Sequence, residues 1–224
     1  MGIRLSEIFK KSLKEQVAQT GETEEALLTS LIELASKRDN ETGSHIVRTA
    51  NYVRLIALRL RAMGHYSEFL SDERIKDFFR AAPLHDIGKV GISDAILKKP
   101  GKLNSEEWEI MKTHTTIGES ILLTVKEKFS HSPSFLDHAV EIAGGHHECW
   151  DGTGYPRGLI GNATPIAARI MTIADVYDAL VSRRVYKEPW THEAACAEIL
   201  KLKGSKFEPI LVDALFEESE SFKI

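Results

Sequence analysis

The sequence predicts an all-α fold, a bundle of helices that form one domain. No stretch of the chain sustains the alternation of apolar and polar residues that strands show, whereas apolar residues recur at helical spacing throughout. An apolar fraction of 42% and a charged fraction of 28% are ordinary for a globular chain. The 224 residues are enough for one domain with a sizeable core and a short appendage.

The first segment, residues 1–22, is expected to be a linker-like helix that precedes the domain. Apolar side chains are scattered along a mainly polar segment, which Thr20-Gly21-Glu22-Thr23 then interrupts. The predicted domain therefore covers residues 23–224. The N-terminal helix could join the domain to an upstream sensor domain or form a homodimer, although its weak periodicity gives little support for a long coiled coil.

Eight helices are expected in the domain, each from its apolar spacing. They cover residues 23–38, 41–63, 73–86, 105–125, 134–147, 165–182, 191–203 and 208–217. The buried stripe of the second is expected to be Val47, Ala50, Val53, Ile56, Ala57 and Leu60. Pro83 should bend the third helix because proline has no N–H to donate. Asn104 and Glu107 form a capping-box start for the fourth.

Charge, hydropathy and cysteine content exclude several classes of protein. A net charge of −4 gives no support for non-specific binding to duplex DNA or RNA, although a locally positive site can still take a small anion. No apolar run reaches the roughly 18 residues of a membrane span. The N-terminus has no apolar signal-peptide core, which favours the cytoplasm. Cys149 and Cys196 have no paired spacing, so any metal must be held by nitrogen and oxygen atoms.

The most informative segment is His-His-Glu-Cys-Trp-Asp-Gly-Thr-Gly-Tyr-Pro at residues 146–156. Its two adjacent histidines, His146 and His147, precede an acidic turn whose glycines let the backbone pass close to a bound ligand. Imidazoles beside carboxylates are typical ligands of a hydrolytic metal centre. The segment therefore predicts metal-dependent chemistry.

Further candidate ligands occur earlier in the chain. Glu41 and His45 are four residues apart, which places them on one helix face, where they could share a cation. A surface ion pair is the alternative interpretation of that spacing. His85 and Asp86 are adjacent at a predicted helix end, and the two oxygens of Asp86 could bridge two metal ions while His85 binds one.

His114 and Asp175 each lie among apolar residues. A lone histidine on an apolar helix face is more often a core residue than a ligand. Here, however, five of the nine histidines have such surroundings, each in a segment with a carboxylate, glycine or lysine. Asp175 lies inside an apolar helix, where a carboxylate is costly unless it is paired or bound to metal. Asp178, one turn later, is expected to orient a ligand histidine or to pair with a cationic side chain.

These motifs occur together and in order, and the chain resembles an HD-GYP domain, the branch of the HD hydrolase superfamily that degrades cyclic di-GMP in bacteria. The resemblance extends from about residue 25 to residue 218. It is carried by Arg38-Asp39-x-x-Thr42-Gly43-x-His45-x-x-Arg48, Leu84-His85-Asp86-Ile87-Gly88-Lys89, Lys112-Thr113-His114, His146-His147-Glu148-x-Trp150-Asp151-Gly152-x-Gly154-Tyr155-Pro156, Ala174-Asp175-Val176-Tyr177-Asp178-Ala179-Leu180 and Arg184-x-Tyr186-Lys187. The block that ends in Gly-Tyr-Pro is far more specific than the His-Asp pair.

The resemblance implies a fold, a metal centre and a set of ligands. The fold is the HD-domain helical bundle with the metal centre in its core, and the implied ions are iron or manganese. The implied ligands are His45, His85, Asp86, His114, His146, His147 and Asp175. Glu41 stands where family members with three ions have an additional ligand, so it favours a trinuclear centre over a binuclear one.

The expected activity is hydrolysis of cyclic di-GMP to linear pGpG, with cleavage to GMP as a further step. Closely spaced divalent ions lower the pKa of a water molecule and stabilise charge on a phosphate. Asp86 and Lys89 are the expected catalytic residues, with Lys89 near the scissile phosphate or the departing 3′ oxygen. The expected substrate contacts are Lys89, Tyr155, Arg184 and Lys187. Without the resemblance, Arg184 and Lys187 fit a solvated basic helix end equally well.

Two other functions stay open. The domain could be a receptor that signals without hydrolysing anything, by binding either a cyclic dinucleotide or a partner protein such as a diguanylate cyclase (GGDEF) domain. The intact set of metal ligands argues against this function. It could also hydrolyse a different cyclic dinucleotide. Cys149, Arg183 and Val185 depart from the residues usual in the family, and none of them is an expected metal ligand.

Overall fold

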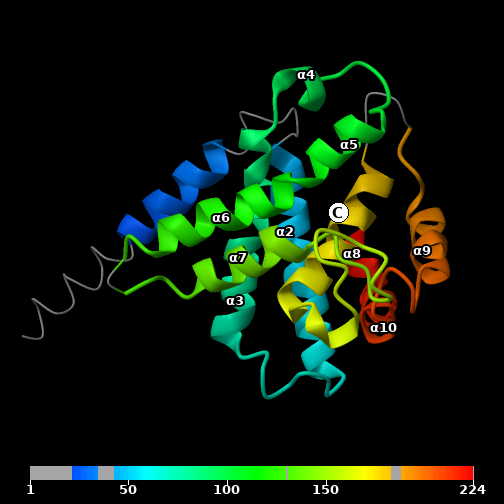
Figure 1. The fold of residues 1–224 in the computed structure, drawn as a ribbon. Coiled ribbons are helices and arrows are strands. Elements are labelled where there is room, and N and C mark those ends of the chain that lie inside the picture. The colour runs from blue at the N-terminus through cyan, green and yellow to red at the C-terminus, as the bar shows by residue number, and fades with distance from the viewer. Residues whose placement is uncertain (1–21, 35–42, 130, 183–187, 224) are drawn as a thin grey trace, which may run out of the picture.

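The fold is all-α in the computed structural model, which describes residues 22–34, 43–129, 131–182 and 188–223 (Figure 1). After a helix at residues 22–34, the α-helices are α2 (Gly43–Ala62), α3 (Asp72–Ala81), α4 (Asp94–Leu97), α5 (Ser105–Lys112), α6 (His114–Lys126), α7 (Phe135–Gly145), α8 (Ile166–Val181), α9 (His192–Lys201) and α10 (Pro209–Glu217). Short 3-10 helices are η1 (Ala82–Leu84), η2 (Ile87–Gly91), η3 (Gly161–Ala163) and η4 (Ser219–Phe222). The described residues contain no β-strand, which confirms the predicted fold class.

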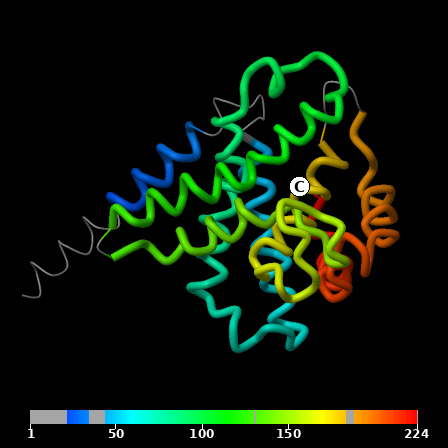
Figure 2. Tube along the Cα trace, viewed as in Figure 1, coloured from blue at the N-terminus to red at the C-terminus, as the bar shows by residue number. Residues whose placement is uncertain are grey.

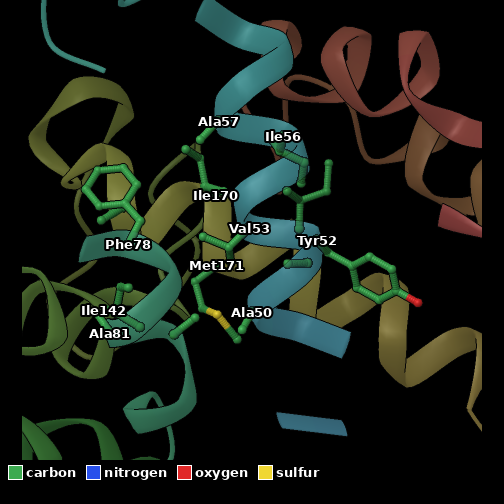
Figure 3. Close-up of a cluster of buried hydrophobic side chains, with 14 of the residues drawn as sticks. Ala50, Tyr52, Val53, Ile56, Ala57, Phe78, Ala81, Ile142, Ile170 and Met171 are labelled. Carbon is green, nitrogen blue, oxygen red and sulfur yellow. The ribbon is translucent and has the colours of Figure 1, made fainter. Parts of the chain in front are cut away.

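Helix α2 runs through the middle of the bundle and contributes one side of the core (Figures 1 and 3). Its Val53 belongs to the same buried cluster as Phe78 of α3 and Ile170 of α8. The prediction for this stripe is wrong at Val47, whose side chain is 59% exposed. Val47 lies roughly two and a half helical turns from the fully buried Ile56, which puts the two residues on opposite sides of α2.

Other elements enclose the core on several sides. The traces of α6 and α7 lie alongside each other in Figure 2, and the two helices are in contact. Helices α9 and α10 pack against α8. Near the C-terminus, Phe222 of η4 stacks on Tyr52 of α2 with ring centroids 4.7 Å apart, and Tyr177 of α8 meets both rings edge-on. The C-terminal segment therefore completes the core rather than extending from it.

The helix predicted at residues 73–86 is shorter than expected. It ends at Ala81, after which Pro83 lies within η1. Proline has no N–H to continue α-helical bonding, and the chain tightens into a 3-10 turn. His85 and Asp86 therefore follow a turn instead of standing on a helix face.

The single helix predicted at residues 105–125 is two helices, α5 and α6. Its capping box is confirmed, because Asn104 and Glu107 each accept a hydrogen bond from the other's backbone N–H at 2.8 Å. Helix α5 ends where the N–H of Thr113 donates to the carbonyl of Ile110 at 3.0 Å. That tight turn lets α6 start afresh at His114.

Residues 1–21 and 35–42 lie outside the described residues. The linker helix and its boundary at residue 22 therefore stay predictions, and both alternatives for it, a connection to an upstream sensor domain and a homodimer, stay open. In the segments that the structure does describe, no helix has both the length and the apolar character needed to cross a bilayer.

Gly88 allows η2 to touch the first turn of α6. A Cβ on Gly88 would lie 1.8 Å from the carbonyl oxygen of His114 and 2.4 Å from the backbone nitrogen of Gly118. Both are backbone atoms, so no change of rotamer could relieve the overlap. The contact brings the turn that carries Asp86 against the start of α6.

We expect Gly88→Ala to lower the free energy of unfolding by about 3 kcal/mol, because the added methyl group overpacks against fixed backbone. Gly91→Ala, in the same 3-10 helix, is the matched control, since the atoms nearest to its methyl group would belong to the Ile117 side chain, which can move, and not to backbone. Urea unfolding of the metal-free proteins measures both changes. Equal losses would mean that η2 moves away from α6 freely, which contradicts the packing argument.

Candidate metal centre

The predicted ligands that the structure describes gather into two groups of metal-binding side chains. One group is Asp86, His114, His146 and His147, and the other is His45, His85 and Asp175. Within each group, one potential ligand atom from every residue lies within 4.8 Å of the others. The residues come from α2, the turn after η1, the start of α6, the end of α7 and α8. Tertiary packing thus joins segments that are far apart in the sequence.

Asp86 lies between the two groups and faces both. Its Oδ2 atom is 3.2 Å from Nε2 of His85, while its Oδ1 atom is 3.3 Å from Nε2 of His114 and 3.6 Å from Nε2 of His146. The two oxygens of this carboxylate therefore face different groups of candidate ligands. This is the geometry in which a carboxylate can bridge two cations.

Backbone carbonyls set the orientation of three of the imidazoles. The Nδ1 atom is 2.9 Å from the Ala82 carbonyl in His85, 2.7 Å from the Met111 carbonyl in His114 and 3.0 Å from the Ile142 carbonyl in His146. A carbonyl oxygen can only accept, so Nδ1 must carry the proton in each ring. The Nε2 lone pair then points toward Asp86, as a metal ligand requires.

The inner atoms of the first group are buried polar atoms that lack hydrogen bonds. Among the described residues, Nε2 of His114, Nε2 of His146 and Oδ1 of Asp86 have no hydrogen-bond partner. Buried acceptors left in this state are costly, and converging lone pairs also repel one another. A divalent cation would remove both costs, so the donor set fits a metal ion.

The charge state at neutral pH also suits a cation. Burial alone would raise the pKa of Asp86, but Lys89 and His85 hold it well below its ordinary value. The Nζ atom of Lys89 is 2.6 Å from Oδ2 of Asp86. Burial lowers the pKa of His114 to about 4 and also lowers that of His147. The carboxylate is ionised and these imidazoles are neutral, which are the forms that bind metal.

Asp178 orients the His45 ring through the Nδ1 atom, the ring nitrogen that does not face the second ligand group. It is 1% exposed, and its Oδ2 atom lies 2.7 Å from Nδ1 of His45. Arg48 donates to both carboxylate oxygens, from Nε at 2.6 Å and from Nη2 at 2.9 Å, and Ser182 donates at 3.0 Å. Burial would raise the pKa of Asp178, yet the bonds from His45 and Arg48 lower it to about 2. This contact leaves Nε2 of His45 3.9 Å from Asp175 Oδ1, inside the second group.

The loop after α7 is fixed by Glu148 and covers part of the first group. Glu148 is 3% exposed and accepts from the backbone N–H of Arg157 at 2.7 Å and of Leu159 at 3.0 Å. The same loop brings Tyr155 onto His147, with ring centroids 4.7 Å apart and an angle of 26° between the planes. Glu148 therefore holds the loop through these backbone hydrogen bonds. It is not in either group of candidate metal ligands, although it follows His147 directly in the sequence.

Three of the predicted site residues cannot be placed, because Glu41, Arg184 and Lys187 lie outside the described residues. Sequence reasoning assigned no role to Arg48, which pairs with Asp178, or to Glu148. Arg48 follows His45 by three residues and so shares its helix face, a spacing that could have indicated a common partner.

A helical bundle with histidines and aspartates around a shared carboxylate defines an HD-type metal-binding domain. The HD domain family matches residues 29–211, and the chain belongs to that family. HD domains bind divalent metal ions, and the described residues of this chain contain a cluster of histidines and aspartates that could hold them. The predicted resemblance to HD-GYP proteins is confirmed.

Curated relatives agree with this assignment. A Vibrio cholerae protein named probable cyclic di-GMP phosphodiesterase is 47% identical over 211 residues, which cover 93% of this chain and 48% of that protein. A Thermotoga maritima cyclic di-GMP phosphodiesterase is 42% identical, with coverage of 93% and 56%. A 3'3'-cGAMP-specific phosphodiesterase of Vibrio cholerae is 44% identical, with coverage of 90% and 36%. The chain spans about half or less of the length of these relatives.

Solved structures share the fold. A cyclic GMP-AMP specific phosphodiesterase of Vibrio cholerae superposes with a TM-score of 0.60 at 21% identity, over 88% of this chain and 50% of that one. An HDG"Y"P protein of Bdellovibrio bacteriovorus superposes with a TM-score of 0.54 at 17% identity, over 78% and 52%. At these identities the likeness concerns the fold alone.

We expect Asp178→Ala to weaken metal binding by about 10- to 100-fold, because His45 loses the acceptor that orients its ring. Metal analysis after dialysis against limiting metal measures the loss. Asp137→Ala is the matched control, since Asp137 is an exposed aspartate that pairs with Lys126 on the surface. Equal metal retention by the two variants would mean that Asp178 does not support the centre.

The metal-free protein should lose stability as the pH falls from about 6.5 to about 4. His114 has a pKa of about 4 in the folded protein against an ordinary value of 6.5. The unfolded chain therefore binds the proton more tightly, and the stabilisation present above pH 6.5 is lost as the pH falls through this window. Urea unfolding at several pH values measures the slope, which His114→Gln should flatten. His65→Gln, at an exposed histidine, is the control, and parallel slopes in all three proteins would contradict the prediction.

Proposed function

We propose that the chain hydrolyses cyclic di-GMP to pGpG, GMP or both, in a metal-dependent reaction. The observation that carries the proposal is the carboxylate of Asp86, whose two oxygens face two separate groups of ligands. Two closely spaced cation positions suit attack of water on a phosphodiester, because the charge that develops is spread over two centres. The names of the relatives from Vibrio cholerae and Thermotoga maritima support this substrate.

We propose iron or manganese as the ions, since histidine nitrogens and carboxylate oxygens without thiolates suit both. His45, His85 and Asp175 would hold one ion, and His114, His146 and His147 would hold another, with Asp86 shared between them. When bound, such ions supply Lewis-acid stabilisation of a phosphate oxygen and an acidified water. Glu41 remains the proposed additional ligand of a third ion.

Other side chains would act on the substrate itself. Lys89 carries its positive charge beside Asp86, at the edge of the ligand groups, where it can compensate charge on the scissile phosphate. Tyr155 has its ring on His147 and its pKa is raised by burial, so its hydroxyl stays protonated and can donate. Arg184 and Lys187 are proposed to bind the second phosphate or a guanine edge.

A second candidate function is hydrolysis of another cyclic dinucleotide. A relative named as specific for 3'3'-cGAMP is 44% identical to this chain, close to the 47% of the probable cyclic di-GMP phosphodiesterase. A substrate panel containing both cyclic dinucleotides discriminates the two functions.

The function is tested by metal analysis of anaerobically purified protein together with chromatography of its reaction products. Two or three iron or manganese atoms per chain with pGpG or GMP as product would support the proposal. A full complement of metal with turnover of cGAMP alone would favour the second candidate. Full metal content without any product would indicate a receptor instead.

We expect Asp86→Ala to abolish hydrolysis of cyclic di-GMP and to lower metal content, because both ligand groups lose their shared carboxylate. Lys89→Ala should reduce kcat by about 10²- to 10³-fold, as loss of a transition-state donor does in other enzymes. Lys98→Ala, at an exposed lysine that pairs with Asp94, is the matched control. Retention of full activity by Lys89→Ala would remove Lys89 from the mechanism.

A further inference from the structure

We propose that Trp108 forms a stacking site for a purine base of the cyclic dinucleotide, and this inference rests on the proposed function. Trp108 lies in α5, outside the set of metal-binding side chains. Its side chain is 47% exposed, which is high for so large an apolar group. Indole rings left open beside a polar site commonly bind flat aromatic ligands.

A continuous series of aromatic rings connects Trp108 with the metal centre. Tyr155 stacks on His147, and its ring centroid is 6.4 Å from that of His114. Trp108 meets Tyr155 at 6.2 Å with an angle of 78° between the planes. An edge-to-face contact uses the rim of one ring, so it does not cover both faces of the indole.

The position of Trp108 matches the layout of a nucleotide. The ribose separates a base from its phosphate, so a base should lie beside a phosphate-binding centre and not upon it. Trp108 satisfies this condition because one ring, Tyr155, stands between it and His147. Lys112 also lies near Tyr155, with its Nζ atom 5.8 Å from the ring centroid, but Glu109 pairs with it at 2.7 Å, so the indole face is the feature that would bind the base.

Helix α5 holds Trp108 on a rigid support. The capping box of Asn104 and Glu107 fixes the helix start, and Lys99 donates to both oxygens of Glu107 at 2.7 and 2.6 Å. At the other end of α5, the carbonyl of Met111 orients His114. One short helix thus ties the proposed base site to a metal ligand, so the base meets a surface whose position is already set.

The test is steady-state kinetics of the metal-loaded protein with cyclic di-GMP, using Trp108→Ala, Trp108→Phe and Ile110→Ala. Ile110 is the matched control because it is also 47% exposed on α5 but offers no π-face. We expect Trp108→Ala to raise KM about tenfold, with the loss in KM rather than kcat, since stacking is equal in ground and transition states. Trp108→Phe should recover most of the affinity, and Ile110→Ala should stay within about twofold of the unaltered protein.

Competitive inhibition by inorganic phosphate separates base stacking from a structural role. Inorganic phosphate has no purine ring to stack on the indole, so its inhibition constant should be the same for the unaltered protein and Trp108→Ala. An equal rise in KM and in the phosphate inhibition constant would overturn the inference, because Trp108 would then act through Tyr155 and the metal ligands. A KM that does not change, or that rises equally in Ile110→Ala, would also overturn it. Failure of the proposed function is distinct, because the unaltered protein would then bind metal and phosphate without hydrolysing cyclic di-GMP.

Discussion

The candidate metal centre depends on keeping one ionised carboxylate, that of Asp86, among imidazoles in a partly buried site. Burial opposes the charge, and the fold compensates by placing Lys89 at 2.6 Å and the His85 ring at 3.2 Å. The inner nitrogens of His114 and His146 converge on the same carboxylate. Folding thereby collects charges and lone pairs that favour a cation, and other parts of the structure serve to hold that arrangement.

Helix ends supply much of the geometry. His85 and His146 cap the C-terminal ends of η1 and α7, while His114 is the first residue of α6. A carbonyl oxygen has two lone pairs, so those of Ala82 and Ile142 accept both the backbone N–H and the Nδ1–H of the same histidine, and that of Met111 accepts the Nδ1–H of His114. These local bonds fix the tautomer and the ring orientation of the candidate ligands.

Residues around the candidate ligands fix the positions of those ligands and of the surfaces that would contact a substrate. Asp178 connects His45 with Arg48 and with Ser182, the residue that follows α8. Glu148 closes the loop that presents Tyr155, and α5 carries Trp108 at the rim of the same loop. Changes in these outer residues are expected to act through position and affinity, because they touch ligands or substrate surfaces without being ligands.

The sequence by itself determined the all-α class, the membership of the HD family and the candidate ligands, because helical periodicity and short motifs are local properties. It also identified the capping box of Asn104 and Glu107, which is local as well. Only the tertiary structure decided where helices break, which oxygen of Asp86 faces which histidine, and that Arg48 supports the centre through Asp178. It likewise turned Val47 to the surface. These features arise from packing between distant segments, such as the backbone contact at Gly88, which no local pattern encodes.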